Sequence, residues 1–302
     1  MLERVVATTV PFSIVDVFAE RPLTGNPLAL VAQAELLAET MLPLVAREFN
    51  QSETTFLLPS TLGATWRLRS FTPTGAEVVG AGHNALGAWW WLADAGHLEL
   101  QDGAGRFTQQ LGDRVLPVDV VGGDHGGPVA IVMEQAPPRF GSTVEQTAPL
   151  AAALGLTTDA LRADVPAQVV DTGAAHLLVP AVDRDAVDRA RPDAPALLAE
   201  LRAVDGQGCY LYSLDPRAPG ATAYARFFNP TVGIWEDPAT GSAAGPLASQ
   251  LVARGLAPDD SSIVVEQGHA MGRPSRLRVD VSGASVRLAG AGVVVAAGTL
   301  SI

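Results

Sequence analysis

Residues 69–74 read RSFTPT and residues 226–231 read RFFNPT, so both share the pattern R-x-F-x-P-T. A second pair of similar stretches follows in the same order, AGHNALGAWWWLADAG at 81–96 and TGSAAGPLASQLVARG at 240–255. The offset between the two copies is 157 residues for the first pair and 159 for the second. Because two matches in one order at nearly one offset seldom arise by chance, we interpret the chain as two related halves.

Each half has the same local pattern of strand, loop and helix. Residues 66–71 and 223–228 alternate in polarity and are rich in β-forming residues, which predicts strands that end before Pro73 and Pro230. A glycine-containing loop then leads to a helix of about twelve residues. The helix is apolar on nearly every side, so we expect a sheet to enclose it. Gly96 and Gly255 stand where a glycine would close the helix C-terminus.

The rest of the chain is rich in strand patterns, and the predicted fold class is therefore α+β. The further predicted strands are 13–18, 54–58, 115–121, 129–133, 175–179, 262–265, 277–281 and 286–288, and the further predicted helices are 40–48 and 144–154. The glycine-rich residues 121–128 predict a linker. We expect domains at 1–124 and 125–290, and the sequence leaves open whether the final strands, near 290–302, join the first domain.

Composition excludes several classes of protein. A chain of 302 residues suits two domains of about 150 residues each, and 48% hydrophobic residues can build their cores. A net charge of -12 repels phosphate backbones, so no nucleic-acid partner is expected. All twenty basic residues are arginine, which rules out a Schiff-base lysine and with it pyridoxal-phosphate chemistry.

Cysteine, histidine and apolar patterns narrow the choice further. The single cysteine, Cys209, excludes an internal disulfide and a cysteine-rich zinc site. The remaining histidines show no metal-ligand spacing with carboxylates, so no metal is expected; they are His97, His125, His176 and His269. No nucleotide-binding glycine fingerprint is present. Without an apolar run of membrane-spanning length or a signal segment, we expect a cytoplasmic protein with no membrane partner.

Both predicted central helices begin at glycine-rich loops, at residues 80–83 and 240–242. Glycine lets a ligand approach the backbone, and free N–H groups at a helix start favour an anion such as a carboxylate. If the two halves face each other, both helix ends point into one cleft, with Gly82, Gly241 and Ser242 as candidate substrate-binding residues. The alternative is that both loops are tight turns before buried helices, and their pairing favours a ligand site.

Three residues are candidates for acid/base chemistry. Glu53 opens a hydrophobic strand, and a carboxylate that enters a core tends to have a raised pKa. His83 stands at a helix start, where the dipole favours a neutral imidazole, and Asp237 precedes the second helix. The alternatives are a solvated strand-end glutamate for the first, and capping or turn residues for His83, Asp237 and Ser242.

Six motifs follow one another along the chain: VDVF at 15–18, GNP at 25–27, SETTF at 52–56, FTP at 71–73, Gly82-His83 and EDPATGSA at 236–243. Their order resembles that of the PhzF family of phenazine biosynthesis. The resemblance covers residues from near 13 to past 250. It implies a diaminopimelate epimerase-like fold, in which two pseudo-symmetric domains each wrap a curved, mostly antiparallel sheet around a central helix. It also implies a homodimer and no cofactor.

The same resemblance implies an isomerase that moves a hydrogen from C3 to C1 of trans-2,3-dihydro-3-hydroxyanthranilate, a small cyclic amino acid with a conjugated diene. Glu53 matches the family's catalytic glutamate, and His83 and Asp237 match polar residues around the substrate. The N–H groups of the two loops, with Ser242, would hold the substrate carboxylate.

Three observations bear on other activities. The related epimerases use two opposed cysteines, which this chain lacks. Ala81 replaces the cysteine that many PhzF-like proteins carry before Gly-His, which favours the phenazine isomerase. Trp235 stands where a smaller residue is expected; it either packs in a core or lines the pocket and changes the substrate. The alternatives are an isomerase of another conjugated amino acid in secondary metabolism and a non-catalytic small-carboxylate-binding protein, against which Glu53 argues.

Overall fold

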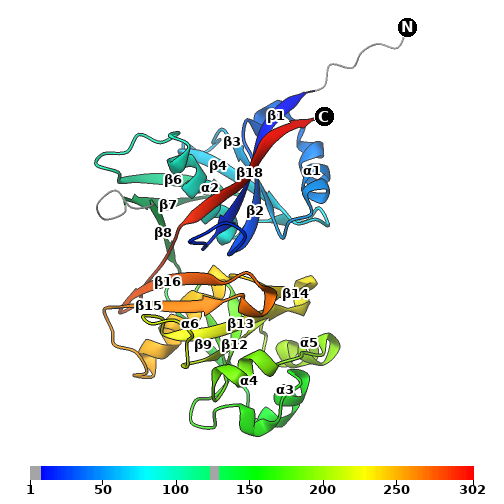
Figure 1. Ribbon diagram of the computed structural model, residues 1–302, viewed down its shortest axis with the longest axis vertical. Coiled ribbons are helices and arrows are strands. Elements are labelled where there is room, and N and C mark those ends of the chain that lie inside the picture. Colours follow the sequence, from blue (N-terminus) through cyan, green and yellow to red (C-terminus); the bar gives the residue numbers. More distant parts are fainter. Residues whose placement is uncertain (1–7, 123–128) are drawn as a thin grey trace. The chain divides into compact units, whose positions relative to one another are not determined.

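The structure is a computed structural model that describes residues 8–122 and 129–302 (Figure 1). The chain divides into two compact units. Unit 1 comprises Met1–Met133 and Ala291–Ile302, and unit 2 comprises Glu134–Gly290. The expected linker at 121–128 and the expected boundary at 124/125 fall mostly or wholly outside the described residues. The last strand pairs along the first, from Thr9 opposite Ser301 to Val17 opposite Gly292, so the chain returns to unit 1.

Unit 1 is built from strands that surround one long helix. Its strands are β1 (Thr9–Val17), β2 (Asn26–Val31), β3 (Thr54–Leu58), β4 (Trp66–Phe71), β5 (Glu77–Val78), β6 (Gly105–Leu111), β7 (Arg114–Val121) and β18 (Gly292–Ser301), and β8 (Ala130–Gln135) crosses the boundary between the units. Its helices are α1 (Leu42–Phe49), α2 (His83–Asp94) and the 3-10 turns η1 (Ala34–Leu36) and η2 (Glu39–Met41).

Unit 2 repeats this plan and adds a helical layer. Its strands are β9 (Arg139–Thr143), β10 (Gln168–Asp171), β11 (Ala175–Pro180), β12 (Gly208–Ser213), β13 (Ala223–Asn229), β14 (Ile234–Asp237), β15 (Ser261–Gln267), β16 (Ser275–Ser282) and β17 (Ser285–Gly290). Its helices are α3 (Thr147–Ala153), α4 (Arg184–Arg189), α5 (Ala194–Ala203) and α6 (Gly241–Ala253), with 3-10 turns η4 (Thr158–Ala160), η5 (Pro230–Val232) and η6 (His269–Met271).

Strand pairing within each unit follows the same sequence. In unit 1, β1–β2 is antiparallel, β2–β3 parallel, β3–β4 antiparallel, β4–β6 parallel and β6–β7 antiparallel. In unit 2, β10–β11, β11–β12, β12–β13, β13–β15 and β15–β16 follow with the same directions in the same order. The internal repeat indicated by two short sequence motifs therefore extends over most of both units.

The R-x-F pattern has the same structural role in both units. Arg69 pairs with Glu77 on the next strand at 2.7 and 2.9 Å, and its guanidinium lies over the ring of Phe71. Arg226 pairs with Glu236 through its Nε and Nη2, each at 2.8 Å, and its guanidinium lies over the ring of Phe228. A planar guanidinium suits both contacts, because it forms a two-pronged carboxylate pair and stacks on an aromatic face.

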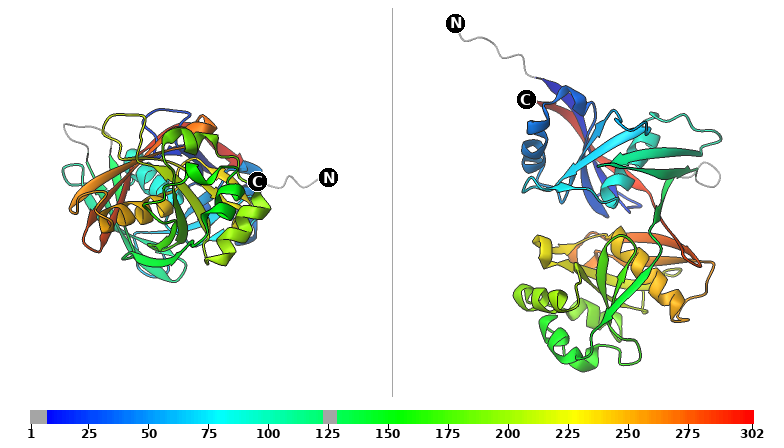
Figure 2. Two further views of the ribbon diagram at one scale, coloured as in Figure 1. Left: turned by 90° about the horizontal axis from the view of Figure 1, so that it is seen from below. Right: turned by 180° about the vertical axis from the view of Figure 1, so that it is seen from behind.

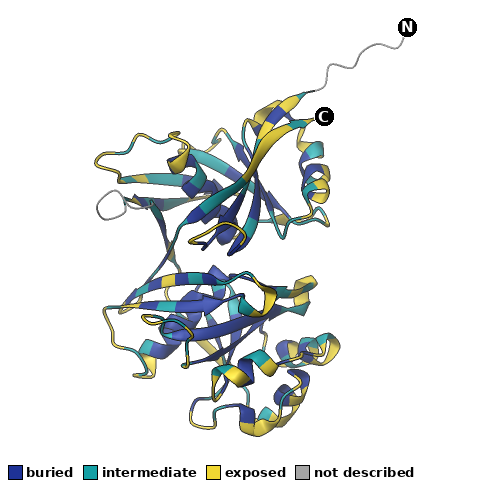
Figure 3. Cartoon of the chain, viewed as in Figure 1, coloured by how far each residue is buried: buried dark blue, intermediate teal, exposed yellow. Residues whose placement is uncertain are grey.

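The central helices are enclosed on nearly all sides (Figures 2 and 3). Helix α2 contacts β1, β2, β3, β7 and β18, and α6 contacts β10, β11, β16 and β17. Their ends are closed as predicted: Gly96 and Gly255 adopt φ of +73° and +67°. The following N–H groups, of His97 and Leu256, donate back to carbonyls of the last turn, as in a Schellman motif.

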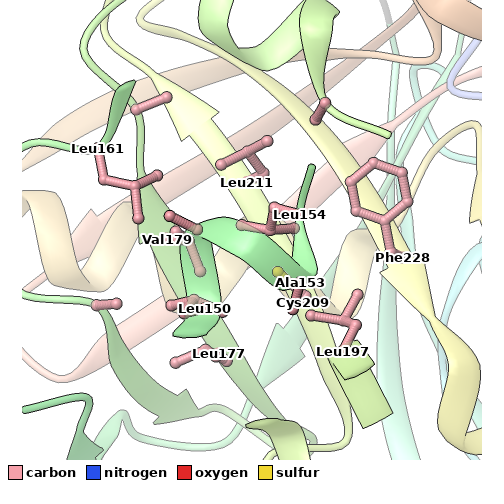
Figure 4. Close-up of a cluster of buried hydrophobic side chains, with 14 of the residues drawn as sticks. Leu150, Ala153, Leu154, Leu161, Leu177, Val179, Leu197, Cys209, Leu211 and Phe228 are labelled. Atoms are coloured by element: carbon pink, nitrogen blue, oxygen red, sulfur yellow. The ribbon is translucent and has the colours of Figure 1, made fainter. Parts of the chain in front are cut away.

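The additional helices of unit 2 cover the sheet face opposite α6. Side chains of α3, α4 and α5 form one buried cluster with Cys209, Leu211, Tyr224 and Phe228 (Figure 4). Burial raises the pKa of the Cys209 thiol to about 12, so this cysteine is a packing residue.

Some elements lack a sequence signal. Strand β2 is a continuous apolar run after a proline, and α4 is too short to show helical periodicity. The expected helix at 40–48 is divided into η2 and α1, and Pro43 occupies the first turn of α1, where it is tolerated. No helix among the described residues is long and apolar enough to cross a membrane.

The two arginine pairs provide a test of burial, although Arg69 also has a second carboxylate, that of Glu39, at 3.1 Å from its Nη1. The side chains of Arg226 and Glu236 are 5% and 9% exposed, whereas Arg69 and Glu77 are 14% and 39% exposed. We expect Glu236→Gln to lower the free energy of unfolding of unit 2 by about 3 kcal/mol, because it leaves a buried guanidinium without its carboxylate. The control, Glu77→Gln, should lower that of unit 1 by less than about 1 kcal/mol. Denaturant titration measures both, and equal losses would contradict the assigned difference.

Candidate functional site

In unit 1, the candidate residues meet at the start of helix α2. Glu53 directly precedes strand β3, and its neighbour Ser52 links two other segments. The Ser52 hydroxyl donates to Oδ1 of Asn26 at 3.3 Å and lies 3.4 Å from Nε2 of His83. The loop that carries Glu53, the start of β2 and the start of α2 therefore converge.

His83 is the first residue of α2 and is 8% exposed. Burial lowers the pKa of its imidazole to about 4, so the ring is neutral near pH 7. The neutral state agrees with the expectation from the helix dipole, although burial is its main cause. A neutral imidazole has one donor and one acceptor nitrogen, so it is able to give or take a proton at a bound substrate.

The loop before α2 is held by Asn84. Its Oδ1 accepts from the N–H of Gly82 at 2.8 Å, and its Nδ2 donates to Ser70 and to the carbonyl of Gly80. Gly82 is the N-cap residue, and no side chain caps the helix. His83 is thus a helical residue and not a cap, and among the described residues no side chain caps the first N–H groups of α2.

In unit 2, Asp237 ends strand β14 beside the start of helix α6. Its Oδ2 accepts from the Thr240 hydroxyl at 2.5 Å, and its carbonyl accepts from Nε2 of Gln267 at 2.7 Å. The Tyr210 hydroxyl donates to Oε1 of Gln267, which also accepts from the N–H of Thr240. Asp237 is 9% exposed and is fixed by this network. Thr240, not Asp237, is the N-cap residue of α6.

Gly241 and Ser242 are the first two residues of α6, and no side chain caps this helix either. Nε2 of Gln135 donates to the carbonyl of Gly241 at 2.9 Å. The Ser242 hydroxyl lies 3.1 Å from Nε2 of His176, so it does not serve as a cap. Burial lowers the pKa of His176 to about 4, while the charge of Asp171 opposes that shift.

The structure thus groups Glu53, Gly82 and His83 in unit 1, and Asp237, Gly241 and Ser242 in unit 2. Sequence patterns alone assign no supporting role to the residues that hold these groups, among them Asn26, Ser52, His176, Tyr210 and Gln267. One usable signal was present: Thr24-Gly25 before β2 recurs as Thr172-Gly173 before β11. That third repeat marks the segments of Asn26 and His176. Tyr210 and Gln267 lie in ordinary strand patterns without a motif.

The part of the chain that the structure describes contains no candidate metal site. Among residues 8–122 and 129–302, no group of three or more histidine, cysteine, aspartate or glutamate side chains is placed to hold a metal ion. The chemistry of both groups of residues is that of acid/base side chains beside uncapped helix starts.

Sequence relatives cover almost the whole chain. The family model described as phenazine biosynthesis-like protein, PhzC-PhzF, matches residues 15–298. The trans-2,3-dihydro-3-hydroxyanthranilate isomerase of Pseudomonas fluorescens is 31% identical over 298 residues, which cover 96% of this chain and 98% of that protein. The uncharacterized isomerase YddE of Escherichia coli K12 is 32% identical over 273 residues, 89% of each chain.

Solved structures are also similar to this chain over almost its whole length. A PhzF-family phenazine biosynthesis protein from Bacillus anthracis matches with a TM-score of 0.88 at 26% identity, over 98% of this chain and 100% of that one. A predicted epimerase from Pseudomonas aeruginosa matches with a TM-score of 0.81 at 34% identity, over 96% and 99%. A hydroxyproline epimerase from Agrobacterium vitis, at 12% identity and a TM-score of 0.64, shares the fold alone.

Two similar units, each with a sheet closed around a central helix, define the diaminopimelate epimerase-like fold, which confirms the expected fold class. Several relatives are named isomerases, which supports an isomerase activity. The chain belongs to the PhzF family.

The buried state of His83 predicts a pH dependence of stability. In the folded protein the pKa of His83 is about 4, below the ordinary value of 6.5. Between pH 4 and 6.5, His83 therefore binds a proton in the unfolded chain but not in the folded chain. The free energy of unfolding of unit 1 should therefore fall as the pH drops from 6.5 towards 4, and it should fall less in His83→Asn. Denaturant titration across this range measures the difference, and an NMR titration of the His83 ring with a midpoint near 6.5 would contradict the assignment.

Proposed function

We propose that the protein is a cofactor-independent isomerase that moves a hydrogen from C3 to C1 of trans-2,3-dihydro-3-hydroxyanthranilate, with Glu53 as the acid/base. The observation that carries the proposal is local. Glu53 directly precedes β3 and follows Ser52, whose hydroxyl lies 3.4 Å from Nε2 of the neutral His83 at the start of α2. The 31% identity to an isomerase with that name, over 96% of the chain, supports the choice of substrate.

The substrate carries a carboxylate, and the two helix starts suit that group. The N–H groups at the first turns of α2 and α6 have no side-chain cap. Such groups, at the positive end of the helix dipole, favour a negative charge. We propose Gly82, Gly241 and the Ser242 hydroxyl as residues that bind the substrate carboxylate.

The proposed reaction neither gains nor loses electrons. The Glu53 carboxylate takes the proton from C3, and the electrons of the C3–H bond move into the diene. Glu53, now protonated, returns a proton to C1. C3 then carries an enol hydroxyl, which becomes a ketone by tautomerisation. The conjugated system spreads the developing negative charge, so the residues of the chain are sufficient for proton transfer.

His83 and Asp237 are proposed to bind the hydroxyl and amino groups. The neutral imidazole of His83 is able to donate to or accept from the substrate hydroxyl. The Asp237 carboxylate suits an ammonium group, and its bond with Thr240 fixes its orientation. We propose that both residues orient the substrate for proton transfer.

Two observations support an alternative substrate, which is another conjugated amino acid. Relatives named only as uncharacterized isomerases are 31–33% identical, as similar as the named isomerase. Trp235, two residues before Asp237, is 55% exposed and so is available to contact a ligand. A non-catalytic carboxylate-binding protein is the third alternative, and the position of Glu53 beside an anion site disfavours it.

The central test compares Glu53→Gln with Glu48→Gln. Glu48 is an exposed residue of α1, five positions away. We expect Glu53→Gln to lower kcat by roughly 10²–10⁴-fold, because the amide cannot take a proton, and Glu48→Gln to leave it unchanged. The loss of diene absorbance measures turnover.

The outcomes separate the three alternatives. Equal activity in wild type and Glu53→Gln would remove Glu53 from the mechanism. A folded wild type that leaves this substrate unchanged, but turns over another unsaturated amino acid in a Glu53-dependent manner, would assign the second substrate. A protein that binds carboxylates without turnover, and binds them more tightly after Glu53→Gln, would be the non-catalytic alternative.

A further inference from the structure

Unit 2 contains a pocket of about 430 Å³ that the proposed reaction does not use. Its polar and aromatic lining residues are Asp188, Arg191, Arg217, Arg226, Trp235 and His269. Three of the twenty arginines of an acidic chain thus meet in one depression, together with an imidazole and an indole.

The pocket opens on the sheet face that carries α3, α4 and α5. In β13, successive side chains point to opposite faces. Tyr224 and Phe228 belong to the cluster under these helices, so Arg226, which alternates with them, shares their face. Phe227 points the other way and packs against His176, whose ring contacts Ser242. The arginine pocket and the Ser242 group therefore lie on opposite faces of this strand.

Two of the charged lining residues, Asp188 and Arg226, are paired with other residues of the protein. Asp188 accepts from the Tyr224 hydroxyl and from Nη2 of Arg217, each at 2.5 Å. Arg226 is held by Glu236 through Nε and Nη2, and its Nη1 donates to backbone carbonyls at the end of α4. These contacts fix the lining side chains in place. Glu236 neutralises the charge of Arg226, and Asp188 neutralises that of Arg217.

Arg191 supplies the remaining positive charge. Its Nη1 donates to the carbonyls of Asp188 and Ala190 at 2.9 and 2.7 Å, which anchors the guanidinium at the pocket. None of the described residues forms an ion pair with it or accepts from its Nε or Nη2. Those two donors form the edge of a guanidinium that fits a carboxylate or phosphate. The Arg217 side chain, 43% exposed, lies on the same pocket, with its charge paired to Asp188.

Trp235 supplies a flat apolar surface beside these cations. The side chain is 55% exposed, which is unusual for a large aromatic residue without a partner surface. Indole faces bind planar rings by stacking. The combination of a guanidinium edge and an exposed indole fits a ligand that is charged at one end and flat at the other.

We propose that this pocket is a second binding site, which takes a small aromatic anion: a flat ring that carries a carboxylate or phosphate, with the anion on Arg191 and the ring on Trp235. The site is separate from the Ser242 group, because Arg226 lies on the face of β13 opposite Phe227, which packs against His176. Its occupancy is measurable without turnover.

The test is a binding titration that Trp235 itself reports. Trp235 is the only tryptophan between residues 134 and 290, so the fluorescence difference between wild type and Trp235→Phe isolates its signal. The probes are phenyl phosphate and benzoate, with inorganic phosphate as the ligand without a ring. Calorimetry on the same proteins gives affinities for variants that lack the fluorophore.

We expect saturable binding of both aromatic probes and weaker binding of inorganic phosphate. Arg191→Gln should weaken the aromatic probes about tenfold, because it removes a charge-assisted pair at the anion. Trp235→Leu should weaken the aromatic probes and leave inorganic phosphate unchanged. The matched control is Arg202→Gln, an exposed arginine on α5 outside the pocket, and it should have no effect.

Four outcomes would overturn the proposal. They are absence of saturable binding at millimolar probe, equal affinities for inorganic and phenyl phosphate, equal weakening by the Arg202→Gln control, and loss of the Trp235 signal in Ser242→Ala. The last would assign the probes to the candidate active site. Because Glu53→Gln should bind the probes like wild type, failure of the isomerase proposal and failure of this one are distinguishable.

Discussion

Enclosure of the two central helices is the constraint on which the rest of the structure depends. Helices α2 and α6 are buried on nearly all sides, so the sheet of each unit must curve around its helix. Their C-termini are closed by Gly96 and Gly255 in left-handed conformation. Their N-termini have no side-chain cap, and a buried helix with an uncapped start concentrates unused N–H donors at one point.

The polar residues of the candidate site gather at these helix starts for the same reason. A buried helix start leaves little space for water, so the side chains around it must satisfy one another: Ser52 links Asn26 and His83, and Gln267 links Tyr210, Thr240 and Asp237. Such networks hold side chains in one geometry, which proton transfer requires. The two units keep this arrangement but fill it differently, since Ser242 in unit 2 stands where unit 1 has His83.

The parts that the sequence predicts best are those that repeat or alternate. Strands β3 and β4 agree with the expected bounds 54–58 and 66–71, and the C-terminal glycines are where the apolar helices predict them. Elements without periodicity were missed, such as α4, which is fixed by the Asp183 cap and by packing. Glu53, His83 and Asp237 stood out by position, but His176 and Gln267 did not, because a polar residue in a strand pattern shows its partner only once the strands are paired. The structure places Trp235, an expected anomaly, at a pocket with three arginines.

The most direct test of the central claim follows the hydrogen itself. Trans-2,3-dihydro-3-hydroxyanthranilate deuterated at C3 is incubated with the wild-type protein in ordinary water, and the labelled carbons are followed by NMR. The proposed mechanism predicts that C3 loses its deuterium as it becomes a carbonyl carbon. It also predicts that C1 becomes a tetrahedral carbon that bears one hydrogen. The deuterium content at C1 reports how far Glu53 retains the label against exchange with water. Consumption of the diene without a hydrogen at C1, or an unchanged substrate in the presence of a folded protein, would contradict it.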